Sequence, residues 1–159
     1  MVISTNKRAY FDYEILETYE AGIDLLGFEV KAIKSGRINL AGSYATLKNN
    51  ELWLLNADIP PYQPNNTPSE YDSKRTRKLL LKRSEIEKIA GSIGKGALPR
   101  SSARGRMLSG LTLVPLKVYT KARRIKIEIG LGKSKKARDK REAIKKREVV
   151  REMRHTLRQ

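Results

Sequence analysis

Two alternating stretches decide the fold: Val114-Pro115-Leu116-Lys117-Val118-Tyr119 and, after a short basic turn, Ile125-Lys126-Ile127-Glu128-Ile129. Apolar residues recur at every second position, which is the side-chain period of a β-strand with one buried face. Two such stretches joined by a short turn predict an antiparallel hairpin whose Lys and Glu side chains face water.

A second hairpin is predicted from residues 44–47 and 52–55, which are separated by Asn49-Asn50. Asparagine tolerates the positive φ angles that tight hairpin turns require. Residues 13–19 add a further strand.

Helices are fewer and shorter in the predicted secondary structure. Ser84-Glu85-Ile86-Glu87 has the pattern of a capping box and opens a helix that runs to about Ile93. A second short helix is predicted over 28–34 and closed by Gly36. Several short strands with small helices predict a mainly β protein, an OB-type antiparallel β-barrel.

The charge of the 159-residue chain favours a polyanionic partner. It has 34 Lys and Arg residues against 17 Asp and Glu residues, a net charge of +17. Nucleic acid is the commonest such partner, and an anionic membrane is the main rival. No apolar run approaches the roughly 20 residues that span a bilayer, and the chain has no cysteine. These features predict a cytoplasmic protein without disulfides.

The chain divides into a body, residues 1–132, and a basic tail, residues 133–159. The tail contains 12 basic and 4 acidic residues. Gly130 and Gly132 lie at the junction, where we expect a hinge. Within the body, a segment rich in Gly, Ser and Arg at about 94–110 shows no periodicity and is predicted to be a flexible basic loop.

Catalytic chemistry has little support in the sequence. The only histidine, His155, lies five residues from the end of the chain, and no phosphate-loop, dinucleotide-binding or zinc-protease motif is present. The acidic residues mostly neighbour Lys or Arg, so we expect no metal site. The prediction is a protein that is not an enzyme and needs no cofactor.

Two stretches of the body are candidates for RNA contact. The basic residues 74–78 precede Leu79-Leu80-Leu81, and are either a rigid positive face or the solvated start of a helix. Tyr10, Phe11 and Tyr13 follow a basic pair and either stack on bases or belong to the core.

The tail has the pattern of a weakly amphipathic basic helix. On such a helix, Ala143, Val150, Met153 and Leu157 share one narrow stripe, with Val149 at its edge. This apolar face is too small to hold a helix together alone in water. We therefore expect the tail to be disordered when free and helical when bound to a polyanion. The stripe has no aromatic residue, which weakens the membrane interpretation.

Several motifs, in order along the chain, resemble the SmpB (SsrA-binding) protein family. They are Asn6-Lys7-Arg8-Ala9, Tyr19-Glu20-Ala21-Gly22-Ile23, Gly27-Phe28-Glu29-Val30-Lys31, Arg75-Thr76-Arg77-Lys78-Leu79-Leu80-Leu81 with Glu85-Ile86, Leu111-Thr112-Leu113-Val114-Pro115-Leu116, and Lys135-Lys136-Ala137-Arg138-Asp139-Lys140-Arg141-Glu142. The fourth motif resembles the family's central helix.

The resemblance implies an OB-type barrel that grips the tRNA-like part of tmRNA during trans-translation. It implies that the tail enters the empty messenger channel and the decoding centre of a stalled ribosome, against 16S rRNA. The RNA-binding residues that carry over are Asn6, Glu20, Leu80 and Lys126, with Lys7, Arg8 and Lys31 as neighbours.

In the tail, the resemblance assigns ribosome contact to Asp139, Lys140 and Arg141, preceded by Lys133, Lys135 and Lys136. It also suggests that Asp139 caps the start of the tail helix. Three departures from the family pattern concern this region and the loop. Arg138 replaces the usual histidine, and a guanidinium can also stack on a base. Ser134 replaces a usual glycine, and about a dozen extra residues lie between Gly91 and Gly110.

A structural ribosomal protein is the strongest alternative, because it too would be small, basic and tailed. It would bind ribosomal RNA permanently and would not select tmRNA. With no apolar seam evident in the sequence, we expect a monomer.

Overall fold

The computed structural model describes residues 1–94 and 111–158. Its elements follow one another in the order β1 (Val2–Thr5), α1 (Lys7–Asp12), β2 (Tyr13–Ile23), α2 (Gly27–Lys34), β3 (Tyr44–Lys48), β4 (Glu51–Leu55), the 3-10 turn η1 (Pro64–Asn66), β5 (Arg77–Leu80), α3 (Arg83–Gly94), β6 (Leu111–Lys121), β7 (Arg124–Ser134) and α4 (Ala137–Thr156). The predicted flexible loop at 94–110 falls almost wholly outside the described residues.

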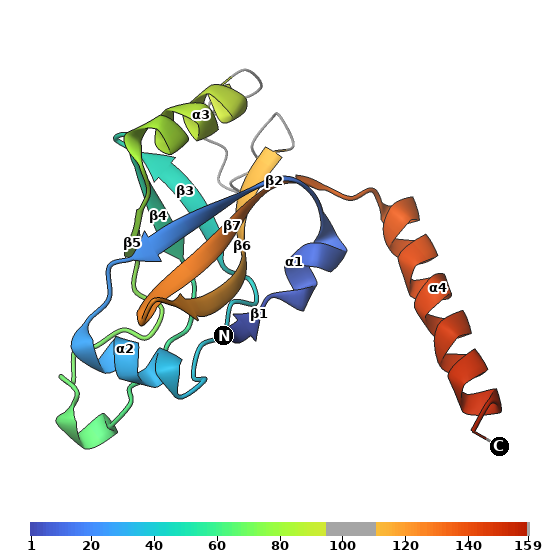
Figure 1. Cartoon of the computed structure of the whole chain (residues 1–159), viewed down its shortest axis with the longest axis horizontal. Helices are drawn as coiled ribbons and strands as arrows, with labels where there is room; N and C mark the ends of the chain where they lie inside the picture. Colours follow the sequence, from blue (N-terminus) through green and yellow to red (C-terminus); the bar gives the residue numbers. More distant parts are fainter. Residues whose placement is uncertain (95–110, 159) are drawn as a thin grey trace.

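Six strands close into a ring (Figure 1). They pair in the order β6-β3-β4-β5-β2-β7, and β7 pairs again with β6. Every pairing is antiparallel, and β1 adds to β6 outside the ring. The predicted fold class, mainly antiparallel β with small helices, is confirmed.

Both predicted hairpins are present, and each turns on two residues with positive φ. In β6–β7, Ala122 and Arg123 have φ angles of 49° and 64°, and Lys121 pairs with Arg124. In β3–β4, Asn49 and Asn50 have φ angles of 52° and 56°. Such two-residue turns match the right-handed twist of the paired strands. Each turn therefore joins its two strands directly, at the position that the sequence pattern predicts.

The predicted helices at 28–34 and 84–93 correspond to α2 and α3, but the stretch 75–81 is not helical. Its centre forms strand β5, in which Arg77 and Leu79 point inward while Lys78 and Leu80 point outward. The backbone of β5 pairs with β4 on one side and β2 on the other. The helix begins only after it, with the Lys82 amide donating to the Glu85 carboxylate at 3.0 Å.

Gly130 and Gly132 are not a hinge, because both lie inside β7 and pair on both sides. A Cβ on Gly130 would come within 2.9 Å of Leu116 Cδ1. One on Gly132 would lie 3.1 Å from Tyr13 Cβ. These glycines therefore let the side chains of Leu116 and Tyr13 pack closely against β7. Strand β7 continues to Ser134, two residues past the predicted end of the body.

The core fills the ring, and helices cover its two ends. Ile33 of α2 and Ile89 of α3 are fully buried against it, and these two helices lie at opposite ends of the ring in Figure 1. Helix α4 extends away from the body, and none of its described residues is buried. In the described part of the chain, no helix has the length and apolar character needed to cross a membrane.

A buried carboxylate, Glu29 on α2, joins three segments of the body. It accepts hydrogen bonds from Arg77 Nη2 at 2.8 Å and Arg75 Nη2 at 2.6 Å. The Tyr71 hydroxyl donates to it at 3.0 Å, and the Leu26 amide at 2.9 Å. The side chains of Glu29 and Arg77 are both 0% exposed.

Hydrogen bonding decides the charge state of Glu29. Burial alone would raise the pKa of this carboxyl, but the bonds from Arg75, Arg77 and the Leu26 amide outweigh burial and lower the pKa to about 2. Arg77 also donates to the carbonyls of Ala57 and Ser73. The pair thus fastens the segment between β4 and β5 to α2.

We expect Arg77→Met to destabilise the protein by ~3–5 kcal/mol, because it leaves a buried carboxylate short of its main partner. Urea unfolding at neutral pH measures this loss. Arg83→Met is the matched control, since Arg83 is 94% exposed and, among the described residues, pairs only with Glu87 on its own helix. Equal midpoints for the two variants would contradict the role given to the buried pair.

Candidate nucleic-acid interface

Three of the predicted RNA-binding residues meet on one outer face of the ring. In the strand register, Gly22 of β2 lies opposite Leu80 of β5 on one side and Lys126 of β7 on the other. Glu20 lies two residues along β2 on the same face. We call Glu20, Leu80, Lys126, the turn residue Arg123 and the first residue of β7, Arg124, the Glu20 surface.

This surface is hollowed beside Gly22. A depression of about 580 Å³ is lined by Leu80, Lys126, Arg123 and Arg124, with Val30 of α2 contributing to its wall. Gly22 has no side chain to fill it, and a Cβ there would lie 3.3 Å from Leu80 Cβ. Leu80 is 52% exposed. Its apolar side chain is therefore available for contact beside Arg123, Arg124 and Lys126, which have no ion pair in the described structure.

Glu20 is the acidic member of the surface, and its neighbours orient it. The Tyr119 hydroxyl donates to its carboxylate, and Lys121 Nζ lies 3.2 Å away. The bond from Tyr119, followed by that from Lys121, lowers the pKa of Glu20. In return, burial and this hydrogen bond raise the pKa of Tyr119. These contacts favour the ionised form of Glu20 and leave a hydrogen-bond acceptor on the outer surface of the sheet.

Asn6 is buried and its amide is fully engaged. Its Nδ2 donates to the carbonyls of Leu40 at 3.2 Å and Pro115 at 2.9 Å, and its Oδ1 accepts from the Ala9 amide at 3.2 Å. Asn6 thereby caps α1 and ties it to β6. Asn6 therefore fixes the placement of α1, which carries the exposed Lys7 and Arg8.

Lys7, Arg8 and Lys31 lie apart from the Glu20 surface. Lys7 and Arg8 are exposed on α1, beside Tyr13 at the start of β2, whereas Gly22 is near its end. Lys31 lines a separate depression with Phe28 and Tyr62. The structure therefore brings together Glu20, Leu80 and Lys126, and distributes the other predicted cations over the body.

The aromatic residues on and just after α1 are all at least partly exposed to solvent. Tyr10 is 43% exposed, while Tyr13 packs beside a small apolar cluster that includes Ala9 and Val114 under α1. Phe11 lies under the guanidinium of Arg147, whose centre is 5.1 Å from its ring.

The predicted tail residues occupy the end of β7 and the first turns of α4. Lys133 still pairs with Glu14 in the sheet, and Lys135 binds the backbone of α1. The N-cap of α4 is Lys136, without a side-chain cap. Asp139 lies within the first turn, so its predicted capping role is wrong, although its charge still complements the positive end of the helix dipole.

The other tail side chains differ in how much they are engaged. Arg138 pairs with Glu142 at 3.5 Å on the helix surface. Arg141 is exposed, whereas Lys140 lies 3.3 Å from Asp12 of α1.

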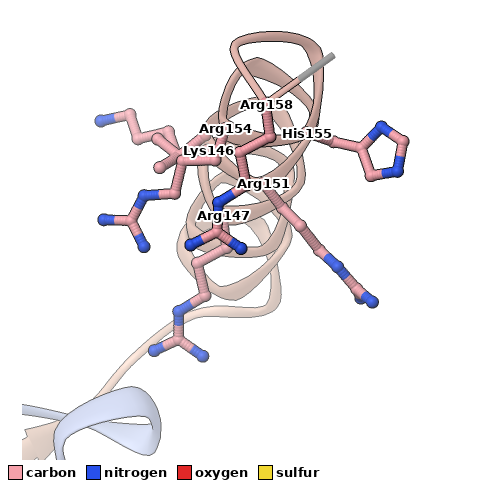
Figure 2. Close-up of a pocket in the computed structure, with 7 residues that line it drawn as sticks. Lys146, Arg147, Arg151, Arg154, His155 and Arg158 are labelled. Atoms are coloured by element: carbon pink, nitrogen blue, oxygen red, sulfur yellow. The ribbon is translucent and has the colours of Figure 1, made fainter.

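The sequence reading missed an arginine stripe on α4. Arg147, Arg151, Arg154 and Arg158 recur at intervals of four, three and four residues, which places them along one side of a helix. Figure 2 shows these side chains with Lys146 and His155; they splay outward from α4, except that Arg158 follows the end of the helix at Thr156. They line an open hollow of about 620 Å³ on the surface. Their spacing alone could have revealed the stripe.

A metal centre has no support in the described residues. Within 1–94 and 111–158, no three His, Asp or Glu side chains gather where they could hold an ion. Arrangement and charge both point instead to a surface for nucleic acid.

The SmpB protein family model matches residues 3–159. The chain belongs to the SmpB family. It is similar to the SsrA-binding protein of Gloeothece citriformis, with 47% identity over 98% of this chain and 92% of the relative. The SsrA-binding protein of Carboxydothermus hydrogenoformans is 46% identical over 99% of this chain and 96% of its own.

A solved structure supports the same family. A chain of the structure described as "tmRNA-SmpB: a journey to the center of the bacterial ribosome" matches with a TM-score of 0.64 and 41% identity, covering 89% of this chain and 93% of that one. The SmpB fold is therefore common to both.

We expect Tyr119→Phe to raise the pKa of Glu20 toward its ordinary value, because it removes the main hydrogen bond to the carboxylate. A carbon-detected NMR titration of Glu20 measures the change. Tyr10→Phe, on α1, should leave the titration as it is. A Glu20 titration that is the same in Tyr119→Phe and the unsubstituted protein would show that Tyr119 does not orient Glu20.

Proposed function

We propose that this protein binds the tRNA-like part of tmRNA through the Glu20 surface and brings it to stalled ribosomes for trans-translation. The observation that carries the proposal is the meeting of Glu20, Leu80 and Lys126 from three strands on one rigid face. These are three of the residues to which the family resemblance assigns RNA contact. The SmpB family and the tmRNA–SmpB structure that the chain resembles support the same RNA.

The chemistry of this face suits folded RNA. Cations contact the backbone phosphates, an ionised carboxylate accepts from base or ribose groups, and an exposed leucine packs on an apolar ring face. The face has a fixed shape because its residues project from paired strands.

The tail supplies the second part of the proposal. An extended basic helix of 20 residues is about 30 Å long at 1.5 Å per residue. Its arginine stripe can follow the phosphates of 16S rRNA in a messenger channel that is empty, whereas bound messenger would exclude it. Binding alone then distinguishes a stalled ribosome from a translating one, without catalysis or a cofactor. The protein acts in the cytoplasm as a monomer. Membership of the SmpB family does not favour the alternative, a structural ribosomal protein.

Replacing Glu20 and Lys126 together with Ala should weaken binding to the tRNA-like part of tmRNA at least tenfold, since the acceptor and the nearest cation are both lost. A gel shift at about 150 mM salt, where nonspecific phosphate binding is weak, measures it. Lys48→Ala with Glu70→Ala is the matched control. It also leaves net charge unchanged, and both residues are exposed and lie outside the lining of the hollow beside Gly22.

Unchanged binding in the Glu20/Lys126 variant would remove this face from the proposal. Equal binding of the unsubstituted protein to tmRNA, an ordinary tRNA and an unstructured RNA would favour the ribosomal-protein alternative.

Ending the chain at Lys136 should preserve tmRNA binding and abolish peptide tagging on stalled ribosomes. This end point keeps all of β7, whereas ending at Gly132 would remove its last paired residues. The gel shift and a tagging reaction in a reconstituted translation system measure the two effects. Loss of tmRNA binding in the shortened chain would contradict the separation of body and tail.

A further inference from the structure

The turn between β6 and β7 adopts a backbone conformation that its residues do not favour. Ala122 and Arg123 both lie in the left-handed region, with φ angles of 49° and 64°. A Cβ makes this region costly for residues other than glycine, and asparagine and aspartate tolerate it better than most. The β3–β4 hairpin meets the same demand with Asn49 and Asn50. The β6–β7 turn therefore carries strain that a more usual turn sequence would avoid.

The strained residue Arg123 lines the hollow beside Gly22. Arg124 and Lys126 line it too, on the outward side of β7, while Ile125 between them is buried. In a continuous strand Arg123 would share the inward side of Ile125, because side chains alternate between the two faces. The left-handed turn instead leaves Arg123 exposed and at the hollow. The unfavourable backbone conformation thus adds a third cation to the lining.

The charges of the hollow favour an anion. Among the described residues that line it, Asp24 supplies the only carboxylate, against the three cations Arg123, Arg124 and Lys126. The exposed side chain of Leu80 adds an apolar wall. A nucleotide fits both features, because the cations can bind its phosphate while the leucine contacts its sugar or base.

We propose that Arg123 binds a backbone phosphate of the RNA held by the Glu20 surface, and that the strain of the β6–β7 turn is retained for this contact. The inference rests on the proposed function, which supplies the RNA. Strained backbone persists where the surrounding structure holds it, and it is concentrated at binding sites. Here the paired strands hold the turn, since Lys121 pairs with Arg124 directly across it. Stability is exchanged for affinity at this one position.

Two glycine substitutions in the same turn separate strain from binding. Ala122→Gly relieves strain at a residue outside the lining of the hollow, whereas Arg123→Gly relieves strain and also removes the guanidinium. We expect each to raise the Tm by about 2–5 °C in thermal unfolding without RNA, because glycine adopts a positive φ at little steric cost. Arg123→Lys is the third variant, and it keeps both the charge and the strain.

Gel shifts with the tRNA-like part of tmRNA, at about 100–300 mM salt, measure the contact. At about 150 mM salt, Arg123→Gly should bind about three- to tenfold more weakly than the unsubstituted protein. The slope of log K against log salt concentration should also fall by about one, the change that follows from one lost phosphate contact. Ala122→Gly should bind as the unsubstituted protein does. Arg123→Lys should keep the salt slope, since an ammonium group also binds phosphate.

Each result has a separate meaning. Unchanged affinity and salt slope in Arg123→Gly would overturn the phosphate contact, and so would an equal loss of affinity in Ala122→Gly. A Tm for Arg123→Gly no higher than that of the unsubstituted protein would overturn the exchange of stability for affinity. Failure of the proposed function gives a different result, in which the unsubstituted protein binds an unstructured RNA as tightly as the tmRNA fragment. The salt slopes would then still decide whether Arg123 binds a phosphate.

Discussion

The rest of the body depends on how one buried carboxylate is satisfied. Glu29 lies where α2, the segment before β5 and β5 itself meet, and it is bonded to all three. Removing two charges from water is costly, so such a pair is weak evidence for stability. The pair instead fixes orientation, since the Arg77 guanidinium can bind the carboxylate and the carbonyls of Ala57, Ser73 and Arg75 together only in one arrangement. That arrangement sets β5, which carries Leu80, against α2, which carries Val30, and so shapes the wall of the hollow beside Gly22.

Closure of the ring then fixes the rest of the Glu20 surface. Each of its six strands has partners on both sides, so a one-residue slip in any of them would turn a buried row of side chains outward. Glu20, Leu80 and Lys126 come from three strands, and their mutual positions follow from register and need no further contact among them. A surface held in this way can recognise an RNA that already has a shape, because it loses little conformational entropy on binding.

Local patterns in the sequence were enough for the hairpins, and distant partners explain what those patterns missed. A few neighbouring residues are enough to predict the turn at Asn49-Asn50 and the strand formed by the alternating isoleucines of β7. Leu79-Leu80-Leu81 shows no periodicity. Leu79 and Leu80 belong to a strand only because β4 and β2 lie on either side of β5. In the same way, burial of Asn6 depends on carbonyls from residues 40 and 115, and the need for Gly130 depends on Leu116 from the neighbouring strand. The resemblance found Glu20 and Lys126 but not Tyr119 and Lys121, which hold the Glu20 carboxylate from strand β6.

Helix α1 shows how differently the ring and the tail are attached to it. Asn6 joins the beginning of α1 to the ring through buried hydrogen bonds to the carbonyls of Leu40 and Pro115. The tail meets α1 at the surface, where Lys140 pairs with Asp12 and the two side chains are 33% and 26% exposed. Solvent and salt weaken a partly exposed ion pair far more than a buried hydrogen bond. The position of the tail can therefore change without altering any contact inside the ring, and the shape of the Glu20 surface does not depend on where the tail lies.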